Sequence, residues 1–556
     1  AQLTSVYRIA PRIPPTPFLP AGMPRLATGG AAAPLRGGRG HHAHLHRSGS
    51  VQADGELLTR GRAALGFWPA AAGWALVAGW LTWRLRGQAL DDFFITYRYS
   101  QNLAAGRGFV FNAGERVFAL TNPGLALALA LGRLLTGIEV PVLASALSGL
   151  ALLAVAAVLL REAQMVERAP EAWLGGTLLV TASFLWVLQG GEGMAMLALL
   201  LLAARWGDSR PVLAGLLAGL AAWFRPEAAV GAGLLAVLVW RERKRLPWRL
   251  AAAAAAVVLL GVLLAWWYFG TPIPNSLAAK RALAADSAGL RFWPQSVELA
   301  RRHAGRLWPA VAGLGLLGQW PLLRAGGRCL RLLSCFALSL AVLYPLLGVA
   351  YAPWYVLPTA AALLYGLAFL IGFLARLAAR AGAGAAAAAA PAGRMLALAV
   401  AVAACAPVAL SLAPAEARWL RRFSWPPHMR AYREAAAWLK AHAPPAATVS
   451  YFEVGALGYF SDRTVIDMVG VVTPELLPYV QRRDFAGAFL ARPGDFALDR
   501  PDRGPWMPVG AGWFQRAYRP VATFGDGGKL ILFQRRPEVP LPPAHPPGGA
   551  EGGGEP

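Results

Sequence analysis

The two adjacent carboxylates Asp91 and Asp92 are the side chains best suited to catalysis, and they open a polar stretch that includes Arg98. A carboxylate can accept the proton of an attacking hydroxyl, so one of the two can serve as a general base. The other can hold the acceptor or a divalent cation, because hard cations prefer oxygen ligands. A hydrated pair of surface carboxylates is the simpler alternative, since the dipeptide by itself is not specific.

Further charged residues interrupt strongly apolar sequence. Glu192 lies in a Gly-Gly-Glu-Gly turn, and Arg225 and Glu227 flank a proline between two apolar stretches. Charged side chains between membrane helices are costly unless they are paired or used, so a structural Arg–Glu pair and a functional site are both open interpretations. For Glu192 the alternative is a solvated residue at a helix-turn-helix corner.

The segment from Tyr268 to Lys280 combines a helix start with a positive charge. Its Pro-Asn-Ser sequence around Asn275 is typical of a helix N-terminus, where backbone N–H groups bind phosphate. Lys280 follows shortly after and can add a point charge. The alternative is a lysine that extends its ammonium group to the membrane surface.

These residues belong to a strongly apolar chain. Hydrophobic residues make up 56% of the 556 residues and charged residues 15%, with a mean hydropathy of +0.45. Soluble domains contain roughly 45–50% apolar and about 25% charged residues. Apolar blocks of about 20 residues match the thickness of a bilayer and must be helical there, so we predict an all-α polytopic membrane domain with about 11 transmembrane helices. The predicted spans are 65–83, 141–160, 173–189, 193–206, 211–224, 228–240, 250–268, 306–321, 329–349, 355–375 and 395–413, with 119–136 as a juxtamembrane or re-entrant helix.

The net charge of +24 is explained by membrane topology. Arginine-rich loops alternate with the loops that contain the candidate residues, and the positive-inside rule places the former in the cytoplasm. The candidate residues then lie together on the extracytoplasmic face, at helix ends. No run of Lys and Arg alternates with aromatic residues on a soluble face, so membrane lipids are expected partners and nucleic acid is not.

Four regions follow from these patterns. Residues 1–62 and 537–556 are rich in Pro and Gly and are predicted to be disordered tails. Residues 63–414 form the transmembrane domain, whose first outer loop is 84–118. Residues 415–536 are predicted to form a small extracytoplasmic α/β domain, because an amphipathic helical pattern is followed by two strand-like runs, 447–460 and 463–472.

Five ordered motifs together resemble polyprenyl-phosphate-dependent glycosyltransferases of the GT-C superfamily. The similarity is to the protein O-mannosyltransferase, aminoarabinose transferase and mycobacterial arabinofuranosyltransferase type. The motifs are the stretch that begins at Asp91-Asp92, then 190–194, 224–227, 268–280 and 351–358. Gly193 stands where these relatives have Thr, which puts a hydroxyl role at that position in doubt. The run from Tyr451 to Gly470 resembles part of the relatives' external domain, for which acceptor binding or covering of the active site is expected.

The resemblance implies a hexosyl- or pentosyltransferase in the bacterial plasma membrane. It would move a sugar with inversion from a polyprenyl-phosphate donor to a hydroxyl of an extracytoplasmic glycan, lipid or protein. It places the base on Asp91 or Asp92, with a slight preference for Asp91, and phosphate contacts on Arg225, Lys280 and Arg98. Beyond a divalent cation as a candidate, no cofactor is expected. The substrate-binding residues expected from it are Arg98, Glu192, Arg225, Glu227, Asn275, Lys280 and Tyr355.

Two other classes of protein remain alternatives. A transporter or flippase of lipid-linked saccharides would have functional charges near mid-membrane and an internal repeat, and the sequence shows neither. A non-catalytic membrane scaffold whose C-terminal domain binds a partner leaves the grouping of charged residues on one face unexplained. For Tyr355 alone, an aromatic residue at the membrane interface is the alternative to a sugar or isoprenoid contact.

Overall fold

The computed structural model describes residues 71–284, 291–382, 425–501, 506–527, 529–544 and 546. All of them belong to one compact unit of the chain, Arg62–Pro556. The predicted tail 1–62, the first residues of the predicted span 65–83, the predicted span 395–413 and most of the predicted tail 537–556 lie outside the described residues.

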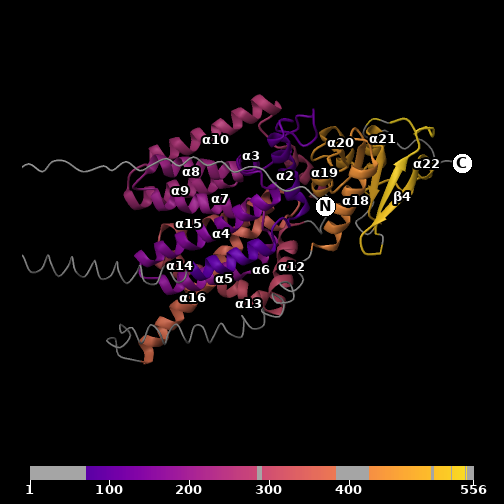
Figure 1. Ribbon diagram of the computed structural model, residues 1–556. Helices are drawn as coiled ribbons and strands as arrows, with labels where there is room; N and C mark the ends of the chain where they lie inside the picture. The colour runs from indigo at the N-terminus through magenta and orange to yellow at the C-terminus, as the bar shows by residue number, and fades with distance from the viewer. Residues whose placement is uncertain are drawn as a thin grey trace, which may run out of the picture. The chain divides into compact units, whose positions relative to one another are not determined.

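The described part of the membrane region is helical, as its apolar blocks predict (Figure 1). A first helix covers residues 71–84 of the described chain. The helices that follow are α2 (Asp91–Ala104), α3 (Pro123–Thr136), α4 (Val140–Met165), α5 (Ala169–Thr181), α6 (Ser183–Val187), α7 (Gly193–Trp206), α8 (Pro211–Phe224), α9 (Ala228–Arg243), α10 (Trp248–Phe269), α11 (Asn275–Ala284), α12 (Phe292–Ala304), α13 (Trp308–Leu317), α14 (Gln319–Ala325), α15 (Arg328–Leu347) and α16 (Leu357–Gly382), with a short 3-10 helix η3 (Pro353–Val356).

Four stretches of the described chain are long and apolar enough to cross a bilayer: α4, α10, α15 and Pro353–Ala378. Helices α3, α7 and α8 are apolar but shorter. Two predicted spans are each divided into two helices, 173–189 between α5 and α6 and 306–321 between α13 and α14. The first division occurs at Ala182, whose extended backbone interrupts the helix. The count of about 11 spans stays a prediction.

Small residues bring two of these helices into backbone contact. Gly215 and Gly219 on α8 are spaced one turn apart, and both face α10. A Cβ atom added at Gly219 would lie 2.8 Å from the carbonyl oxygen of Ala254, and one at Gly215 would overlap the carbonyl of Leu250. Such small-residue spacing lets membrane helices pack closely where no hydrophobic force draws them together.

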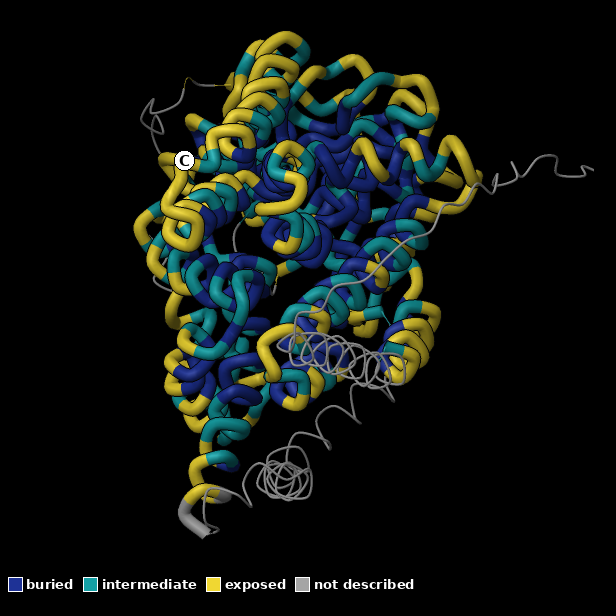
Figure 2. The backbone as a smooth tube through the Cα atoms, turned by 90° about the vertical axis from the view of Figure 1, so that its left-hand side faces the viewer, coloured by how far each residue is buried: buried dark blue, intermediate teal, exposed yellow. Residues whose placement is uncertain are grey.

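Burial differs strongly between the spanning helices. Half of the residues in the most apolar stretch of α4 are buried inside the protein, whereas only 11% of those in the corresponding stretch of α10 are buried. Figure 2 shows buried backbone enclosed by exposed turns. The exposed side chains of α10 include Leu260, Leu263 and Trp267. Lipid solvates such apolar side chains without cost, so we expect α10 to face lipid.

The C-terminal region is a small α/β domain, and its described residues form a five-stranded sheet with the order β2-β1-β3-β5-β4. Strand β1 runs parallel to both β2 and β3, while β5 runs antiparallel to β3 and β4. Its elements are α18 (Pro427–His442), β1 (Thr448–Tyr451), α19 (Gly455–Ser461), β2 (Thr464–Asp467), α20 (Leu477–Gln481), α21 (Phe485–Ala491), β3 (Phe496–Asp499), α22 (Gly512–Ala517), β4 (Tyr518–Phe524) and β5 (Leu530–Arg535).

The predicted strand-like run 447–460 is wrong in its second half, where the chain forms α19. Gly455 and Gly458 lie on this helix and pack directly against Asp91 and Phe111 of the preceding region. Side chains at these glycines would collide with those neighbours, so the close approach of the two regions selects glycine there. Tertiary packing thus decides a local structure that the apolar pattern alone assigned to a strand.

Helix α19 joins the C-terminal domain to α2 (Figure 1). The ring of Phe94 on α2 lies 5.4 Å from Tyr459 and 5.1 Å from Phe460, centroid to centroid. Phe94 is fully buried by these contacts. An aromatic cluster therefore holds α2, the helix that begins with the paired carboxylates, against the C-terminal domain.

Candidate functional site

A cavity of about 400 Å³ lies between α2, α11 and the C-terminal domain. Its walls come from segments far apart in the sequence, including the start of α2, the start of α11 and the loops that follow β1 and β2. Both polar and aromatic side chains line these walls, as is typical of ligand sites. The charged residues of its described lining are Asp91, Asp92, Glu192, Lys280, Glu453 and Asp467.

Asp91 is used to hold α19 in place. Its carboxylate accepts hydrogen bonds from the backbone N–H groups of Ala456, at 2.8 Å, and Gly455, at 3.1 Å. Burial, followed by the charge of Glu453, raises the pKa of Asp91 to about 8, against the opposing effect of the bond from Ala456. A carboxyl group with this pKa is largely protonated at neutral pH, and both of its oxygens are already engaged.

Asp92 differs from its neighbour in exposure and partner. Its side chain is 49% exposed, and its Oδ2 atom lies 3.7 Å from Nζ of Lys280. The ammonium group of Lys280 also lies 4.7 Å from the ring centre of Trp354, within the range of a cation–π contact. Lys280 therefore points into the cavity, and the alternative of a lysine extended to the membrane surface is wrong.

Glu192, Arg225 and Glu227 form a buried network behind the cavity. Nη1 of Arg225 donates to Oε1 of Glu192 at 2.7 Å, Nε of Arg225 donates to Glu227, and Nη2 donates to the hydroxyl of Tyr344 at 3.1 Å. The second oxygen of Glu192 accepts from Asn122 at 2.9 Å. Glu192 is 3% exposed, so the solvated-turn interpretation is wrong for it.

The same network changes the expected role of Arg225. This guanidinium is 4% exposed, is occupied by two carboxylates, and is absent from the described lining of the cavity. The structure thus forms the Arg–Glu pair of the alternative interpretation, with Glu192 as a second acidic partner. Arg225 acts on the cavity through Glu192, whose position it holds.

Helix α11 begins at Asn275, as its sequence predicts. Nδ2 of Asn275 donates to the carbonyls of Gly470, at 2.5 Å, and Val471, at 2.8 Å, so this side chain ties α11 to the C-terminal domain. The next residue, Ser276, lines the cavity. Its hydroxyl is buried and has no hydrogen-bond partner among the described residues. Ser276 lies in the helix-start motif itself, which is the signal that could have identified it.

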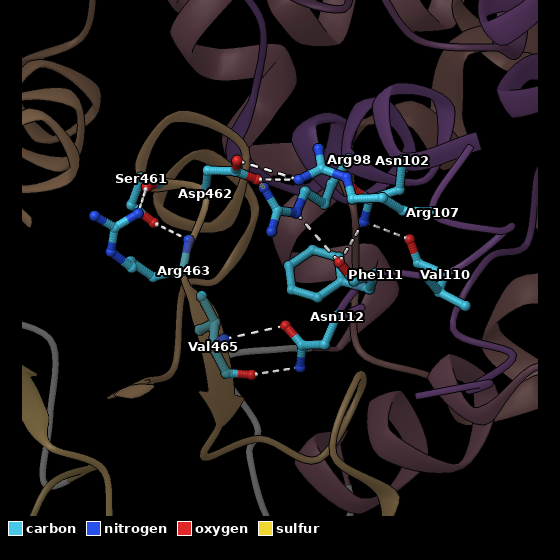
Figure 3. A network of polar contacts seen from close by, with 10 residues as sticks. All are labelled: Arg98, Asn102, Arg107, Val110, Phe111, Asn112, Ser461, Asp462, Arg463 and Val465. Atoms are coloured by element: carbon cyan, nitrogen blue, oxygen red, sulfur yellow. Dashed lines mark hydrogen bonds and ion pairs between the residues drawn. The ribbon is translucent and has the colours of Figure 1, made fainter. Parts of the chain in front are cut away.

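Arg98 lies outside the described lining of the cavity, contrary to the phosphate contact expected for it. Figure 3 shows its side chain beside Asp462 and Phe111 instead. Its guanidinium donates to Asp462 at 2.7 Å and to the carbonyl of Phe111 at 3.2 Å. Arg107 joins the same carboxylate at 2.9 Å. With 3% exposure, Arg98 is a buried link between α2 and the end of α19. The positive charge of Arg98 therefore binds the C-terminal domain through Asp462.

Tyr355 is 7% exposed and stacks on Tyr344, with ring centres 4.1 Å apart. This position excludes the alternative of an aromatic residue facing the membrane interface. Its neighbour Trp354 lines the cavity instead. Tyr355 therefore supports Lys280 and Arg225, whose cations lie 5.6 Å and 5.3 Å from its ring centre.

The run from Tyr451 to Gly470 was expected to bind the acceptor or cover the active site, but the cavity-lining residues of the C-terminal domain were not singled out from the sequence. Phe452, Glu453 and Trp506 all line this cavity. Glu453 follows directly after β1, where an acidic residue in a Tyr-Phe-Glu-Val-Gly run was the available signal. Among the residues that the structure describes, no three His, Cys, Asp or Glu side chains are grouped to hold a metal ion. The divalent cation beside the carboxylate pair stays a prediction.

An apolar cavity of about 370 Å³ adjoins this site, lined by α3, α8 and α10. It shares Leu120 and Thr121 with the central cavity. Its other walls include Phe118, Trp223 and Phe269. The polar cavity and the apolar one therefore share part of a wall.

Comparison with known proteins supports the fold. ArnT from Cupriavidus metallidurans in the apo state is similar to this chain with a TM-score of 0.53 and 15% sequence identity, covering 86% of this chain and 100% of that one. The same protein bound to undecaprenyl phosphate gives a TM-score of 0.50 at 15% identity, with the same coverage. A crystal structure of the Archaeoglobus fulgidus oligosaccharyltransferase with zinc and sulfate has a TM-score of 0.47 at 13% identity, covering 72% of this chain and 62% of that one.

Neither the matching sequence family nor the curated proteins indicate an activity for this chain. Residues 422–541 match a family described as a domain of unknown function (DUF8728). No curated protein matches the chain significantly. The chain therefore has the same fold as ArnT, in agreement with the fold that the resemblance implies. Its apolar helices are those of an integral membrane protein, and its C-terminal region is a small α/β domain.

Proposed function

We propose that this protein is an inverting membrane glycosyltransferase that moves a sugar from a polyprenyl phosphate to an acceptor hydroxyl on the extracytoplasmic face. The observation that supports it best is the pairing of Asp92 with Lys280 in one cavity. Sugar transfer from a phosphate needs a base for the incoming hydroxyl and a cation for the outgoing phosphate. These two side chains supply one of each.

The donor phosphate would bind at the start of α11. Lys280 offers an ammonium group, and the buried hydroxyl of Ser276 lacks a partner among the described residues. The dipole at a helix N-terminus adds to the attraction for an anion. As the bond to the sugar breaks, negative charge grows on the leaving phosphate oxygen, and positioned donors stabilise that charge.

The apolar cavity beside this site would take the polyprenyl tail. It is lined in part by α10 and shares Leu120 and Thr121 with the polar cavity. A lipid-borne donor can then enter sideways from the bilayer with its phosphate at Lys280. The polyprenyl tail stays in apolar surroundings in this step, because it passes from the bilayer into an apolar cavity.

Asp92 is the better candidate for the base, in place of the slight preference for Asp91. It is exposed to the cavity, whereas both oxygens of Asp91 accept backbone hydrogen bonds. In the proposed step, Asp92 takes the acceptor proton and the acceptor oxygen forms a bond to the anomeric carbon. The bond from that carbon to the phosphate oxygen breaks, and its electron pair leaves with the polyprenyl phosphate.

The proposed sidedness is supported by the two ends of α9. Its start adjoins Arg225 and Glu227 behind the cavity. Its other end, at Arg243, joins a cluster of ion pairs that includes Asp208 and Arg328. Arginine-rich ends face the cytoplasm by the positive-inside rule, so the cavity would face away from it.

The test is transfer of radiolabelled sugar by the purified full-length protein from a panel of polyprenyl-phosphate sugars to envelope acceptors. The wild type should transfer at least one sugar. Asp92→Asn keeps the shape of the side chain but removes the base, and should lower the rate by about 10²–10⁴-fold. Asp526→Asn, on an exposed loop of the C-terminal domain, is the matched control and should remain active.

Full transfer by Asp92→Asn would refute its role as base. Movement of intact lipid-linked saccharide across the bilayer, with no transfer from any donor, would favour the transporter alternative instead.

A further inference from the structure

A separate cavity of about 280 Å³ lies between α6, α12, α13 and α16. None of its described lining residues also lines the central cavity or the apolar cavity that adjoins it. Its described lining is apolar or aromatic apart from four residues: Ser183, Ser296, His303 and Thr359. A space of this kind suits a hydrocarbon chain, and the proposed function makes no use of it.

Helix α12 lies beside α6 and α13 and turns one face toward this cavity (Figure 1). At the end of α12, Nδ1 of His303 lies 3.1 Å from the hydroxyl oxygen of Ser183 on α6. At its start, Trp293 is 53% exposed, which is typical of a tryptophan at the membrane surface. Helix α12 therefore has the character of an amphipathic helix that lies at that surface. The residues that face the cavity follow one another at intervals of three or four: Trp293, Val297, Ala300 and Ala304.

The segment that contains α12 carries an excess of positive charge. Residues 291–306 include four arginines and one glutamate, which leaves three positive charges in excess. Glu298 lies 3.0 Å from Arg302 and 3.7 Å from Arg301, so it offsets only one of these charges. Arg291 and Arg306 are exposed and form no ion pair with another described residue. Each arginine lies within two residues of a lining residue in the sequence, so the positive charge gathers around the cavity.

Membrane topology does not explain these arginines. Phe292 of α12 stacks on Tyr344 with ring centres 5.8 Å apart, and Tyr344 accepts a hydrogen bond from Arg225 behind the central cavity. Helix α12 therefore lies at the same end of the bundle as that cavity, which the proposed sidedness places outside the cytoplasm. The positive-inside rule predicts few arginines there, so this cluster indicates an anionic partner at the membrane surface.

We propose that this cavity binds an acyl chain of a phospholipid with an anionic head group, and that the arginines around α12 bind the head group. Basic residues on an amphipathic helix attract anionic lipids, whereas a zwitterionic head group carries its own cation and is attracted less. Because Phe292 packs on Tyr344, the bound lipid also holds α12 against the network that positions Glu192. This lipid is neither the donor nor the acceptor, so the inference goes beyond the proposed function.

Photo-crosslinking of the full-length protein in nanodiscs tests where the lipid binds. The nanodiscs carry a phosphatidylglycerol with a diazirine on one acyl chain, or a phosphatidylcholine with the same label. Phosphatidylglycerol should label peptides from residues 292–312 several-fold more strongly than phosphatidylcholine does. Equal labelling by the two lipids, or labelling that misses these residues, would overturn the proposal. So would displacement of the label by undecaprenyl phosphate more strongly than by unlabelled phosphatidylglycerol, because the cavity would then belong to the donor.

A double variant removes two of the positive charges. Arg301→Gln combined with Arg306→Gln should lower the labelling of residues 292–312 by phosphatidylglycerol about tenfold. The matched control is Arg249→Gln, at an exposed position at the start of α10 and outside the described lining of the cavity. This control should keep the labelling of the wild type. Unchanged labelling in the double variant would overturn the proposal.

A second variant narrows the cavity without changing the charge, and it decides the question if the double variant folds poorly. Ala300→Leu places a larger side chain at a lining position and should reduce the labelling by phosphatidylglycerol while all four arginines remain. Ala310→Leu is the matched control, because Ala310 is exposed on α13 and lies outside the described lining. Equal labelling of these two variants would place the acyl chain elsewhere and overturn the proposal.

Discussion

Asp91 and Asp92 are chemically identical neighbours, and the structure gives them different surroundings. Asp91 accepts two backbone hydrogen bonds from the start of α19, while Asp92 faces the cavity near Lys280. Adjacent residues on a helix point in directions about 100° apart, so one can hold a domain while the other faces a substrate. The pair is thus a structural residue beside a proposed base.

The pKa of Asp91 leads to a testable dependence of stability on pH. Its folded pKa of about 8 lies above the usual value of 3.8, so the folded state binds the proton more tightly than the unfolded state does. This stabilisation is complete below about pH 4 and is lost as the pH rises through about 8. Asp91→Asn stays neutral and should avoid the loss.

Thermal unfolding of the full-length protein between pH 5 and pH 9 measures this effect. Asp91→Asn should match the wild type near pH 5 and exceed its Tm at pH 9 by about 2 °C or more. Asp462→Asn provides a contrast, because Arg98 and Arg107 hold the pKa of Asp462 below its usual value despite its partial burial. That variant should be less stable than the wild type at neutral pH. Parallel curves for Asp91→Asn and the wild type would contradict the account.

Lys280 carries a separate prediction about the donor. Lys280→Met keeps most of the apolar stem but removes the ammonium group, so the KM for a polyprenyl-phosphate sugar should rise about tenfold or more. Lys280→Arg restores the charge and should recover part of the affinity. Steady-state kinetics at saturating acceptor provides the measurement, and an unchanged donor KM in Lys280→Met would remove the lysine from the phosphate site.

At the scale of elements, α19 depends on the absence of a side chain. A Cβ atom at Gly455 would overlap the backbone carbonyl of Asp91, which cannot move aside as a flexible side chain would. Gly455→Ala should therefore push α19 from α2 and destabilise the fold by about 1–3 kcal/mol. Gly510→Ala is the control, because nothing lies within 4 Å of the position of its Cβ atom.

Thermal or denaturant unfolding compares these two glycine variants. A drop in stability for Gly455→Ala with none for Gly510→Ala is expected. Equal stabilities of the two variants would mean that α2 and α19 can move apart to accept the extra methyl group without loss of stability.

Sequence patterns located some elements closely and could not supply others. The predicted span 211–224 coincides with α8, because Pro211 starts the helix and the polar Arg225 follows its end. Helix α19 was mistaken for a strand, since its apolar pattern is short and its glycines are explained only by contacts with α2. Local sequence patterns indicate where a helix or strand is apolar and where it ends. They do not indicate which distant segment will pack against it.

The candidate site shows the same limit. Sequence motifs identified Asp92 and Lys280, and the fold brings them within 3.7 Å. They could not show that Arg225 would be taken up by Glu192, or that Arg98 would pair with Asp462. A charged residue in an apolar chain signals that a partner exists, but the partner's identity is a property of the folded molecule.

At the scale of the whole molecule, the cavity exists only while the C-terminal domain is docked. Buried Arg98 on α2 helps to hold this domain, because it donates to the carbonyl of Phe111 and to Asp462 at the end of α19. Arg98→Met should leave Asp462 and the carbonyl of Phe111 without this donor and loosen the domain. Faster hydrogen–deuterium exchange in α19 and β2, with unchanged exchange in α4, is expected.

Arg430→Met removes an exposed ion pair within the C-terminal domain, to Asp526, and serves as the control. It should leave exchange at α19 unchanged, since exposed pairs contribute little. Slow exchange at α19 in Arg98→Met would show that the aromatic cluster alone holds the domain.

A structure of the full-length protein in nanodiscs with undecaprenyl phosphate would show where the lipid phosphate binds. We expect phosphate density within hydrogen-bonding distance of Lys280 Nζ and Ser276 Oγ, with the tail running along Phe118 and Trp223. Phosphate bound at the opposite ends of the helices, near Arg328, or a central cavity that stays empty at saturating lipid, would contradict this expectation.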